Sequence, residues 1–258
     1  MRKLIDYLAD NPRRVVRIGW ERARQLLADH EITFQRTKTW KESTDPERDA
    51  KLARIEQVIN DHPDRTFAFD EFGPLACVPT PGVCWAPARR PQRLPANYHK
   101  TQGVRQFHGC YSVDADRLWG VVRKRKSAAN TLAALRSIRA ARPDGEPVYV
   151  ILDNLSAHKG ARIRRWAERN NVELCFTPIY ASWANPIEVH FGPLRSFVLA
   201  NSEYANHVAL TRGLHDYLRW RSAHARHPDV LSAQRRERAR VRSERHRRWG
   251  QPRQRSAA

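Results

Sequence analysis

The sequence predicts an α/β protein in which a mixed sheet is flanked by helices. Residues 66–122 contain three β-prone segments in succession, and residues 128–200 then alternate between helical and strand-like patterns. The unbroken apolar run Val148–Leu152 is typical of a central strand that is covered on both faces. The resulting order, βββ-α-β-α-β-α, implies antiparallel and parallel strands in one sheet with helices packed against it.

The segment before this sheet is predicted to be helical. The spacing of apolar residues predicts helices over residues 2–10, 20–30 and 46–60. The first two are separated at Asn11-Pro12, and the third follows the helix-start signal Ser43-Thr44-Asp45-Pro46. On the third helix, one face presents Leu52, Ile55 and Ile59. These helices therefore precede the sheet in the chain.

The sheet elements follow in order. Strands are predicted over residues 66–69, 106–113, 118–122, 148–152 and 172–176, the second and third forming a hairpin around Asp114-Ala115-Asp116. Helices are predicted over residues 128–141, with the stripe Leu132, Leu135 and Ile138, over residues 160–170, and from Pro186 onward. Gly192-Pro193 is expected to kink or restart the last helix, with residues 194–199 continuing its core face.

Composition points to a polyanionic partner. The chain has 258 residues and carries 47 Lys and Arg against 27 Asp and Glu, for a net charge of +20 and a pI of about 10.8. Residues 229–258 alone hold ten arginines and three acidic residues, which indicates a solvated basic helix or tail. We favour nucleic-acid contact for this segment over a role in solubility alone.

Membrane and secreted classes are excluded by the same sequence. No run approaches the ~18 apolar residues that a membrane helix needs, and the N-terminus lacks the apolar core of a signal peptide. None of the four cysteines forms a C-x-x-C pair, so we expect them to be reduced, buried, apolar side chains: Cys77, Cys84, Cys110 and Cys175. A cytoplasmic protein with no membrane partner is predicted.

Three acidic residues are candidates for metal-dependent chemistry. Asp70 and Asp153 each end a predicted strand, and 34 residues separate Asp153 from Glu188. Three converging carboxylates suit Mg²⁺ or Mn²⁺, and two such ions ~3.5–4 Å apart can act on a phosphodiester. Structural roles remain open on the residues alone. Asp70 could close a turn with Glu71, Asp153 could cap the next helix, and Glu188 could complete a capping box.

Three strings around these residues, FDEFGPL (69–75), ILDNLSAH (151–158) and YASWANPIE (180–188), resemble the bacterial insertion-sequence branch of the mariner superfamily of DDE transposases. The Asp–Glu spacing is the DD34E pattern of that branch, and the resemblance runs from about Gln35 to His227. It implies a ribonuclease-H-like catalytic domain with Asp70, Asp153 and Glu188 as ligands of two Mg²⁺ ions, with Mn²⁺ able to substitute. Glu71 is then a neighbour and not a ligand.

The resemblance also implies a reaction and partners. The enzyme would nick DNA at transposon ends and join the freed 3′-hydroxyl to duplex target DNA, usually at TA, as a homodimer in a synaptic complex. We expect it at the nucleoid of a bacterial cytoplasm. Alternatives are a catalytically inert DNA-binding remnant of a decayed element, and a ribonuclease H acting on RNA–DNA hybrids. The connector over 35–52 and the YASWANPIE string argue against the second.

Relatives of this kind begin with paired helix-turn-helix modules, and this chain starts inside what resembles the second one. We therefore expect an N-terminally truncated transposase with three parts. Residues 1–45 would be a partial helix-turn-helix segment and linker, residues 46–227 the catalytic domain, and residues 228–258 a basic tail.

Further site candidates follow from the same positions. Asn154, His158 and Asn185 could orient the ligands or contact the scissile phosphate, although helix capping by the asparagines and an exposed His158 remain open. His190 is expected to be a helix-surface residue and not a metal ligand, because Mg²⁺ prefers oxygen ligands. The candidate DNA-binding residues are Arg22, Arg24, Arg89, Arg90, Arg93, Arg123, Lys124, Arg125 and Lys126. Tryptophans are expected mostly in the core or at an interface: Trp20, Trp40, Trp85, Trp119, Trp166, Trp183, Trp220 and Trp249.

Overall fold

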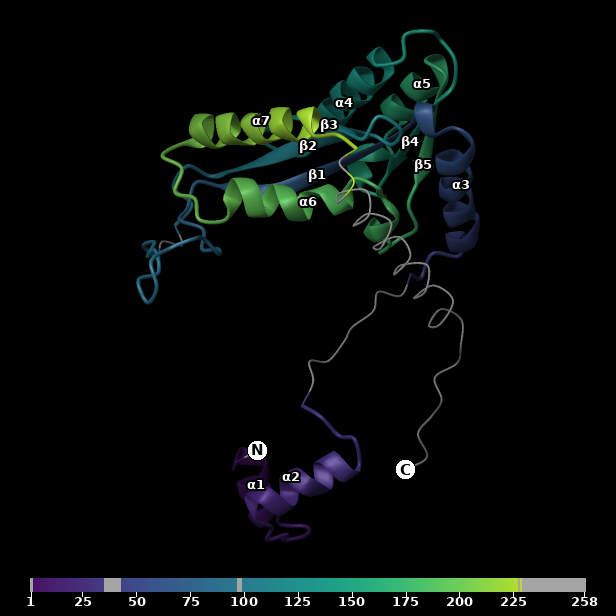
Figure 1. Ribbon diagram of the computed structural model, residues 1–258. Coiled ribbons are helices and arrows are strands. Elements are labelled where there is room, and N and C mark those ends of the chain that lie inside the picture. The colour runs from purple at the N-terminus through teal and green to yellow at the C-terminus, as the bar shows by residue number, and fades with distance from the viewer. Residues whose placement is uncertain (1, 35–42, 97–98, 227, 229–258) are drawn as a thin grey trace. The chain divides into compact units, whose positions relative to one another are not determined.

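The computed structural model describes residues 2–34, 43–96, 99–226 and 228 (Figure 1). The chain forms two compact units, Met1–Trp40 and Lys41–Ala258. Most of the connector, including Trp40, and almost all of the predicted basic tail, including Trp249, lie outside the described residues.

The first unit contains two helices, α1 (Arg2–Ala9) and α2 (Trp20–Asp29), at the positions the sequence predicts. The backbone N–H of Val16 donates to the carbonyl of Leu8 at 2.8 Å, which folds the intervening segment back onto α1. Ala23 is the buried residue of α2, whereas Trp20 is half exposed.

The second unit is built on a five-stranded mixed sheet of order β3-β2-β1-β4-β5. Its strands are β1 (Thr66–Ala76), β2 (Val104–Ser112), β3 (Arg117–Arg123), β4 (Val148–Leu152) and β5 (Val172–Phe176). The first three strands pair antiparallel, and β1, β4 and β5 pair parallel. The predicted fold class is therefore confirmed.

Helices cover both faces of this sheet (Figure 1). Their bounds are α3 (Arg48–Asp61), α4 (Ala128–Ala140), α5 (Ala161–Arg169), α6 (Glu188–Leu194) and α7 (His207–Ala223). One apolar cluster joins α3, α6 and α7 to the sheet, and a second joins α4 and α5 to it. On β1, Ala68 and Phe72 belong to the first cluster, while Phe67 and Phe69 belong to the second. Side chains alternate along a strand, so the sheet has two buried faces.

The strand β1 is longer than predicted. The apolar pattern places its end at Phe69, but the antiparallel ladder with β2 continues through Asp70, Glu71 and Phe72 to Ala76. Two adjacent carboxylates interrupt the apolar pattern of this strand, so the pattern alone predicts an end before them. Both are buried, so Asp70 does not close a surface turn.

The region around α6 also differs from the prediction. The helix begins at Glu188 and not at Pro186, and the side chain of Asn185 caps no helix. At the other end, the expected interruption by Gly192-Pro193 takes the form of a π-helical turn, Arg195–Leu199, directly after α6. Leu194 and Val198 are buried, so the core face continues as predicted.

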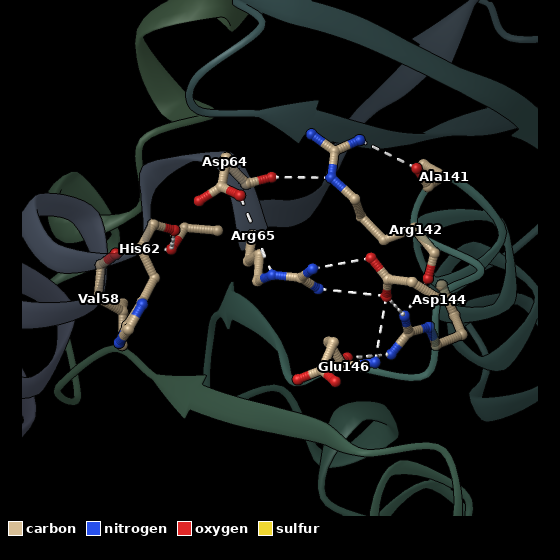
Figure 2. Close-up of polar contacts among 10 residues, drawn as sticks. Val58, His62, Asp64, Arg65, Ala141, Arg142, Asp144 and Glu146 are labelled. Atoms are coloured by element: carbon tan, nitrogen blue, oxygen red, sulfur yellow. Dashed lines mark hydrogen bonds and ion pairs between the residues drawn. The ribbon is translucent and has the colours of Figure 1, made fainter.

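A polar network ties the amino ends of β1 and β4 together (Figure 2). Arg65, just before β1, donates two hydrogen bonds to the carboxylate of Asp144, at 3.2 and 2.8 Å. Arg142 donates to the carbonyl of Asp64 at 3.0 Å. Hydrogen bonds from Arg65 hold the pKa of Asp144 at about 2, so the pair stays charged at neutral pH. This clamp fixes the two parallel strands whose opposite ends carry the candidate acids.

Several expectations about burial are corrected. All four cysteines are free, and Cys110 and Cys175 are buried as expected, but Cys84 is exposed on a loop. Trp20, Trp85 and Trp220 are exposed and do not belong to the core. Among the described residues, no helix combines the length and apolarity that crossing a lipid bilayer requires.

Candidate active site

Strand β1 places Asp70 beside the end of β4. The parallel pairing of the two strands reaches Ala68, opposite Ile151, and Asp70 lies two residues further along β1. Asp70 is buried, and its Oδ1 accepts a hydrogen bond from the backbone N–H of Glu71 at 2.7 Å. It shares its side of the strand with Ala68 and Phe72, which pack in the cluster that contains α6.

Asp153 follows β4 directly. Its Oδ1 accepts a hydrogen bond from the backbone N–H of Leu155 at 3.1 Å and lies 2.7 Å from Nδ1 of His158. Asp153 thus closes a local turn and does not cap α5, whose N-cap is Gly160. Its side chain is 31% exposed, so one side of the carboxylate faces open space.

Glu188 is the first residue of α6 and is half-buried. Its backbone N–H donates to the carbonyl of Asn185 at 3.1 Å, which positions the start of the helix against the sheet. A capping box is absent here because the Asn185 side chain points to β1 instead.

The three acids interact electrostatically. Burial of Asp70, together with the negative charges of Asp153 and Glu188, raises the pKa of Asp70 to about 7. Asp153 and Glu188 are therefore near enough to Asp70 for their charges to act on it. In the part of the chain that the structure describes, no group of three His, Cys, Asp or Glu side chains is arranged so that it could hold a metal ion as it stands.

Asn185 meets Asp70 from the loop before α6. It is fully buried, and its Nδ2 donates to the carbonyl of Phe69 at 3.0 Å and lies 3.5 Å from Oδ2 of Asp70. Its Oδ1 is buried without a hydrogen-bond partner. A buried amide oxygen that is unpaired among the described residues, on a side chain next to Asp70, adds a hard oxygen donor of the kind that Mg²⁺ and Mn²⁺ prefer. The residues present thus fit a divalent cation.

Behind Asp153 lies a buried bridge through His158, a residue that the sequence indicated could orient the ligands, to Glu71, a partner that the sequence did not predict. His158 is fully buried, with Nδ1 toward Asp153 and Nε2 3.2 Å from Oε1 of Glu71. Burial alone would lower the pKa of His158, but the hydrogen bonds to both carboxylates outweigh it and raise the pKa to about 9. The imidazolium therefore links Glu71 to Asp153 at neutral pH. The alternative of an exposed His158 is wrong.

Glu71 is the partner that fixes this bridge. It lies on the opposite side of β1 from Asp70, where it also meets Nδ1 of His108 at 3.5 Å and Nζ of Lys126 at 3.8 Å. Strand alternation explains why adjacent acids separate in this way. In the sequence, the signal for this bridge was the pair Asp70-Glu71 on a buried strand together with a histidine five residues after Asp153.

Burial of Asp153 raises the pKa of its carboxyl, but hydrogen bonds from His158 and the Leu155 N–H outweigh burial and leave the pKa below its usual value. At neutral pH the carboxylate of Asp153 is therefore charged, whereas Asp70 is only partly charged. Asn154 has no capping role either, because Leu155 and Gly160 are the N-caps of the next two helical segments and no side chain caps them. Its Nδ2 donates to the carbonyl of Thr177 after β5. His190 is buried against the ring of Tyr111, 4.2 Å between centroids, and is not the surface residue expected.

The candidate DNA-binding residues fall in three places. Arg123 is the last residue of β3, and Lys124, Arg125 and Lys126 follow it. The contact of Lys126 with Glu71 brings this segment beside the site. Arg89, Arg90 and Arg93 are exposed on the long loop between β1 and β2. Arg22 and Arg24 are exposed on α2 in the first unit, where Arg24 pairs with Glu21.

Solved structures share this architecture. The Mos1 strand transfer complex matches with a TM-score of 0.63 and 13% sequence identity, covering 95% of this chain and 78% of that chain. The mariner Mos1 paired end complex with Mg matches with a TM-score of 0.59 and 15% identity, covering 93% and 77%. These likenesses establish the fold class, a ribonuclease-H-like sheet flanked by helices.

Sequence comparison then gives the family. Residues 65–211 match the DDE superfamily endonuclease family, and the chain belongs to it. The matched range contains Asp70, Asp153 and Glu188 together with the whole sheet. No curated protein sequence matches the chain significantly.

Proposed function

We propose that the chain is a transposase of an insertion sequence, which cleaves DNA at transposon ends and transfers the cut strand to a target. The observation that carries the proposal is the position of Asp70, buried on β1 within reach of the charges of Asp153 and Glu188: burial first, and then repulsion by these two carboxylates, raises its pKa to about 7. A site that gathers negative charge in this way is stabilised by a bound cation.

In this proposal Asp70, Asp153 and Glu188 would hold two Mg²⁺ ions, with Mn²⁺ able to substitute, and the buried Oδ1 of Asn185 would supply a further oxygen acceptor. Divalent ions bound there would activate the attacking oxygen and stabilise the leaving oxygen. His158 keeps the carboxylate of Asp153 in one orientation. Support comes from solved complexes whose descriptions name Mos1 with Mg and with Mn.

In each of the two proposed chemical steps, an oxygen attacks a phosphorus and a 3′-oxygen leaves it. In the first, water attacks a phosphorus at the transposon end, the bond from phosphorus to the 3′-oxygen breaks, and that oxygen receives a proton. In the second, the free 3′-hydroxyl attacks a phosphorus of target DNA in line, and the target's own 3′-oxygen leaves. No covalent protein intermediate is needed.

The proposed partners are duplex transposon ends, a target at TA and a second copy of the chain in a synaptic complex. The net charge of +20 favours DNA as partner, and the similar Mos1 structures are described as paired-end and strand transfer complexes. We place the enzyme at the nucleoid of a bacterial cytoplasm. Residues 1–45 would serve as a helical DNA-binding segment and linker, and residues 228–258 as a basic tail.

A strand-nicking and strand-transfer assay tests the proposal, using DNA that carries the element's own ends with Mg²⁺ or Mn²⁺. Glu188→Gln removes one ligand charge and is expected to abolish nicking, whereas Glu168→Gln, at an exposed position on α5, should leave it within about twofold. Metal-dependent nicking lost only in Glu188→Gln supports the assignment. DNA binding without nicking in the wild type would favour the inert remnant.

A further inference from the structure

A cavity of about 510 Å³ opens beside Asp153 at the carboxyl ends of β4 and β5. Two segments line it, residues 153–155 after β4 and residues 177–182 after β5. Ligand sites of α/β sheets gather at this edge, and the volume lies within the range of small-molecule sites. Because Asp153 lines the cavity, a group bound there would lie next to the candidate catalytic carboxylates.

The aromatic side chain of Tyr180 stands at this cavity in an unusual backbone conformation. Its φ is +60°, a left-handed value that is rare for a bulky residue, and the residue is 69% exposed. Within the described part of the chain, its hydroxyl makes no hydrogen bond. An exposed aromatic ring in a strained turn is not there for packing, and such strain is found preferentially at functional sites.

Hydrogen bonds from three directions hold this turn. The N–H of Ile179 donates to Oδ2 of Asp45 at 3.1 Å, and Ser43 Oγ donates to the carbonyl of Ile179 at 2.6 Å. Asn154 Nδ2 donates to the carbonyl of Thr177. Asp45 is itself buried and paired with Lys51 at 2.8 Å. The position of Tyr180 is therefore fixed by the segment before α3 as well as by the sheet.

The lining decides the chemistry of the ligand. Residues 153–155 and 177–182 contain no Lys or Arg, and their one charged side chain is the negative Asp153. A phosphate group is therefore disfavoured within the cavity itself. Apolar surface comes from Leu155, Pro178, Ile179 and Ala181, and hydrogen-bonding edges from Asn154, Thr177 and Ser182. A neutral, flat group with a polar edge fits this combination.

We propose that this cavity receives an unstacked nucleobase of the DNA strand whose phosphate lies at Asp153, with Tyr180 stacking on the base. The inference rests on the proposed function, because it takes DNA to be the substrate. Stacking on one aromatic ring is tolerant of sequence, so the subsite would hold the strand in place without selecting its sequence. It also offers a way to keep the reacting strand separated from its complement at the site of chemistry.

The test measures base stacking without turnover. The probe is a DNA duplex with a three-nucleotide unpaired 3′ overhang that carries 2-aminopurine at one overhang position at a time, titrated in Ca²⁺. Tyr180→Phe keeps the ring, and Tyr180→Asn removes it while tolerating the left-handed backbone. Phe197→Ala serves as the matched control, since Phe197 is equally exposed, at 68%, on the π-helical turn.

We expect wild type and Tyr180→Phe to quench one 2-aminopurine position strongly. Tyr180→Asn should lose that quenching and bind the overhang about 5- to 150-fold more weakly, with an unchanged melting temperature. Phe197→Ala should behave as wild type. Equal quenching and affinity in Tyr180→Asn would overturn the subsite. The proposed function fails in a different way. In that case quenching still depends on Tyr180, but the wild-type protein does not nick DNA with Mg²⁺ or Mn²⁺.

Discussion

At the scale of single residues, the site depends on which face of a strand each acid occupies. Asp70 and Glu71 are neighbours in sequence, but Asp70 meets Asn185 and Glu71 meets His158. Asp70 therefore belongs to the candidate ligands, and Glu71 acts on Asp153 only through the imidazole. A substitution at Glu71 or His158 would alter the charge and orientation of Asp153 without removing any candidate ligand.

His158→Asn tests this bridge. The variant leaves Glu71 buried with only weaker contacts, so we expect the free energy of unfolding to fall by about 2–4 kcal/mol at pH 6. The pKa of His158 rises from 6.5 to about 9 on folding, so its contribution is complete below pH 6.5 and is lost as pH rises through 9. The difference between wild type and variant should therefore shrink between pH 7 and pH 10.

Urea unfolding measured across this pH range checks the prediction. His30→Asn, at an exposed position after α2, is the control and should change stability by less than ~0.5 kcal/mol at every pH. A His158→Asn deficit that stays constant to pH 10 would show that His158 contributes by packing and not through its charge.

Sequence reasoning identified the three acids and proposed that Asn185 and His158 could orient them. Asp153 and Glu188 could be found because their spacing and flanking strings form a recognisable pattern. The contacts that Asn185 and His158 make could not be predicted, because each reaches β1 across more than eighty residues. Local rules favour capping for such residues, and the tertiary contact outweighs that preference.

At the scale of elements, the hairpin of β2 and β3 is joined to the end of α7 by a buried ion pair. Asp116 in the turn pairs with Arg221, which also donates to the carbonyl of Asp116 at 2.9 Å. Tyr111 donates to Oδ1 of the same carboxylate at 3.0 Å, and the backbone N–H of Arg226 donates to Oδ2 at 2.8 Å. Burial raises the pKa of Asp116, but Arg221 and the other donors outweigh burial and leave the pKa lowered.

Arg221→Met removes the cation and leaves Asp116 buried with two neutral donors. We expect a loss of about 3–5 kcal/mol in the free energy of unfolding at pH 7, since an unpaired buried charge is costly. Arg219→Met on the same helix removes an exposed pair with Asp216 and should cost less than ~1 kcal/mol. Denaturant unfolding of the two variants gives the comparison, and similar losses in both would contradict this account of α7.

The helices and strands themselves were largely predictable. Val148–Leu152 matches its predicted bounds, and α4 ends one residue before its predicted end, because a continuous apolar run and a helical stripe are local signals. The strand β1 extends further because pairing with β2 stabilises residues that have low strand propensity. The helix α6 starts later than predicted because the side chain of Asn185 donates a hydrogen bond to the carbonyl of Phe69 on β1 and does not cap the helix.

At the scale of the whole molecule, charge is distributed unevenly along the chain. Ten of the 47 Lys and Arg residues lie within residues 229–258, against three acidic residues. Because each phosphate that a protein neutralises releases condensed counterions, a basic tail that binds DNA steepens the dependence of binding on salt. The tail lies outside the described residues, so its expected role rests on its sequence.

Deleting residues 229–258 should weaken binding to a 30-base-pair duplex and reduce the slope of log Kd against log salt by ~0.9 for each phosphate that the tail neutralises in the full chain. Fluorescence anisotropy between 50 and 300 mM KCl measures the slope. A full-length variant with all ten tail arginines changed to Gln separates charge from length and should reproduce the deletion, while Arg→Lys replacements should keep most of the slope. If the Gln variant retains the wild-type slope, the positive charge that binds DNA lies in the sheet unit or on α2, and the tail serves solubility.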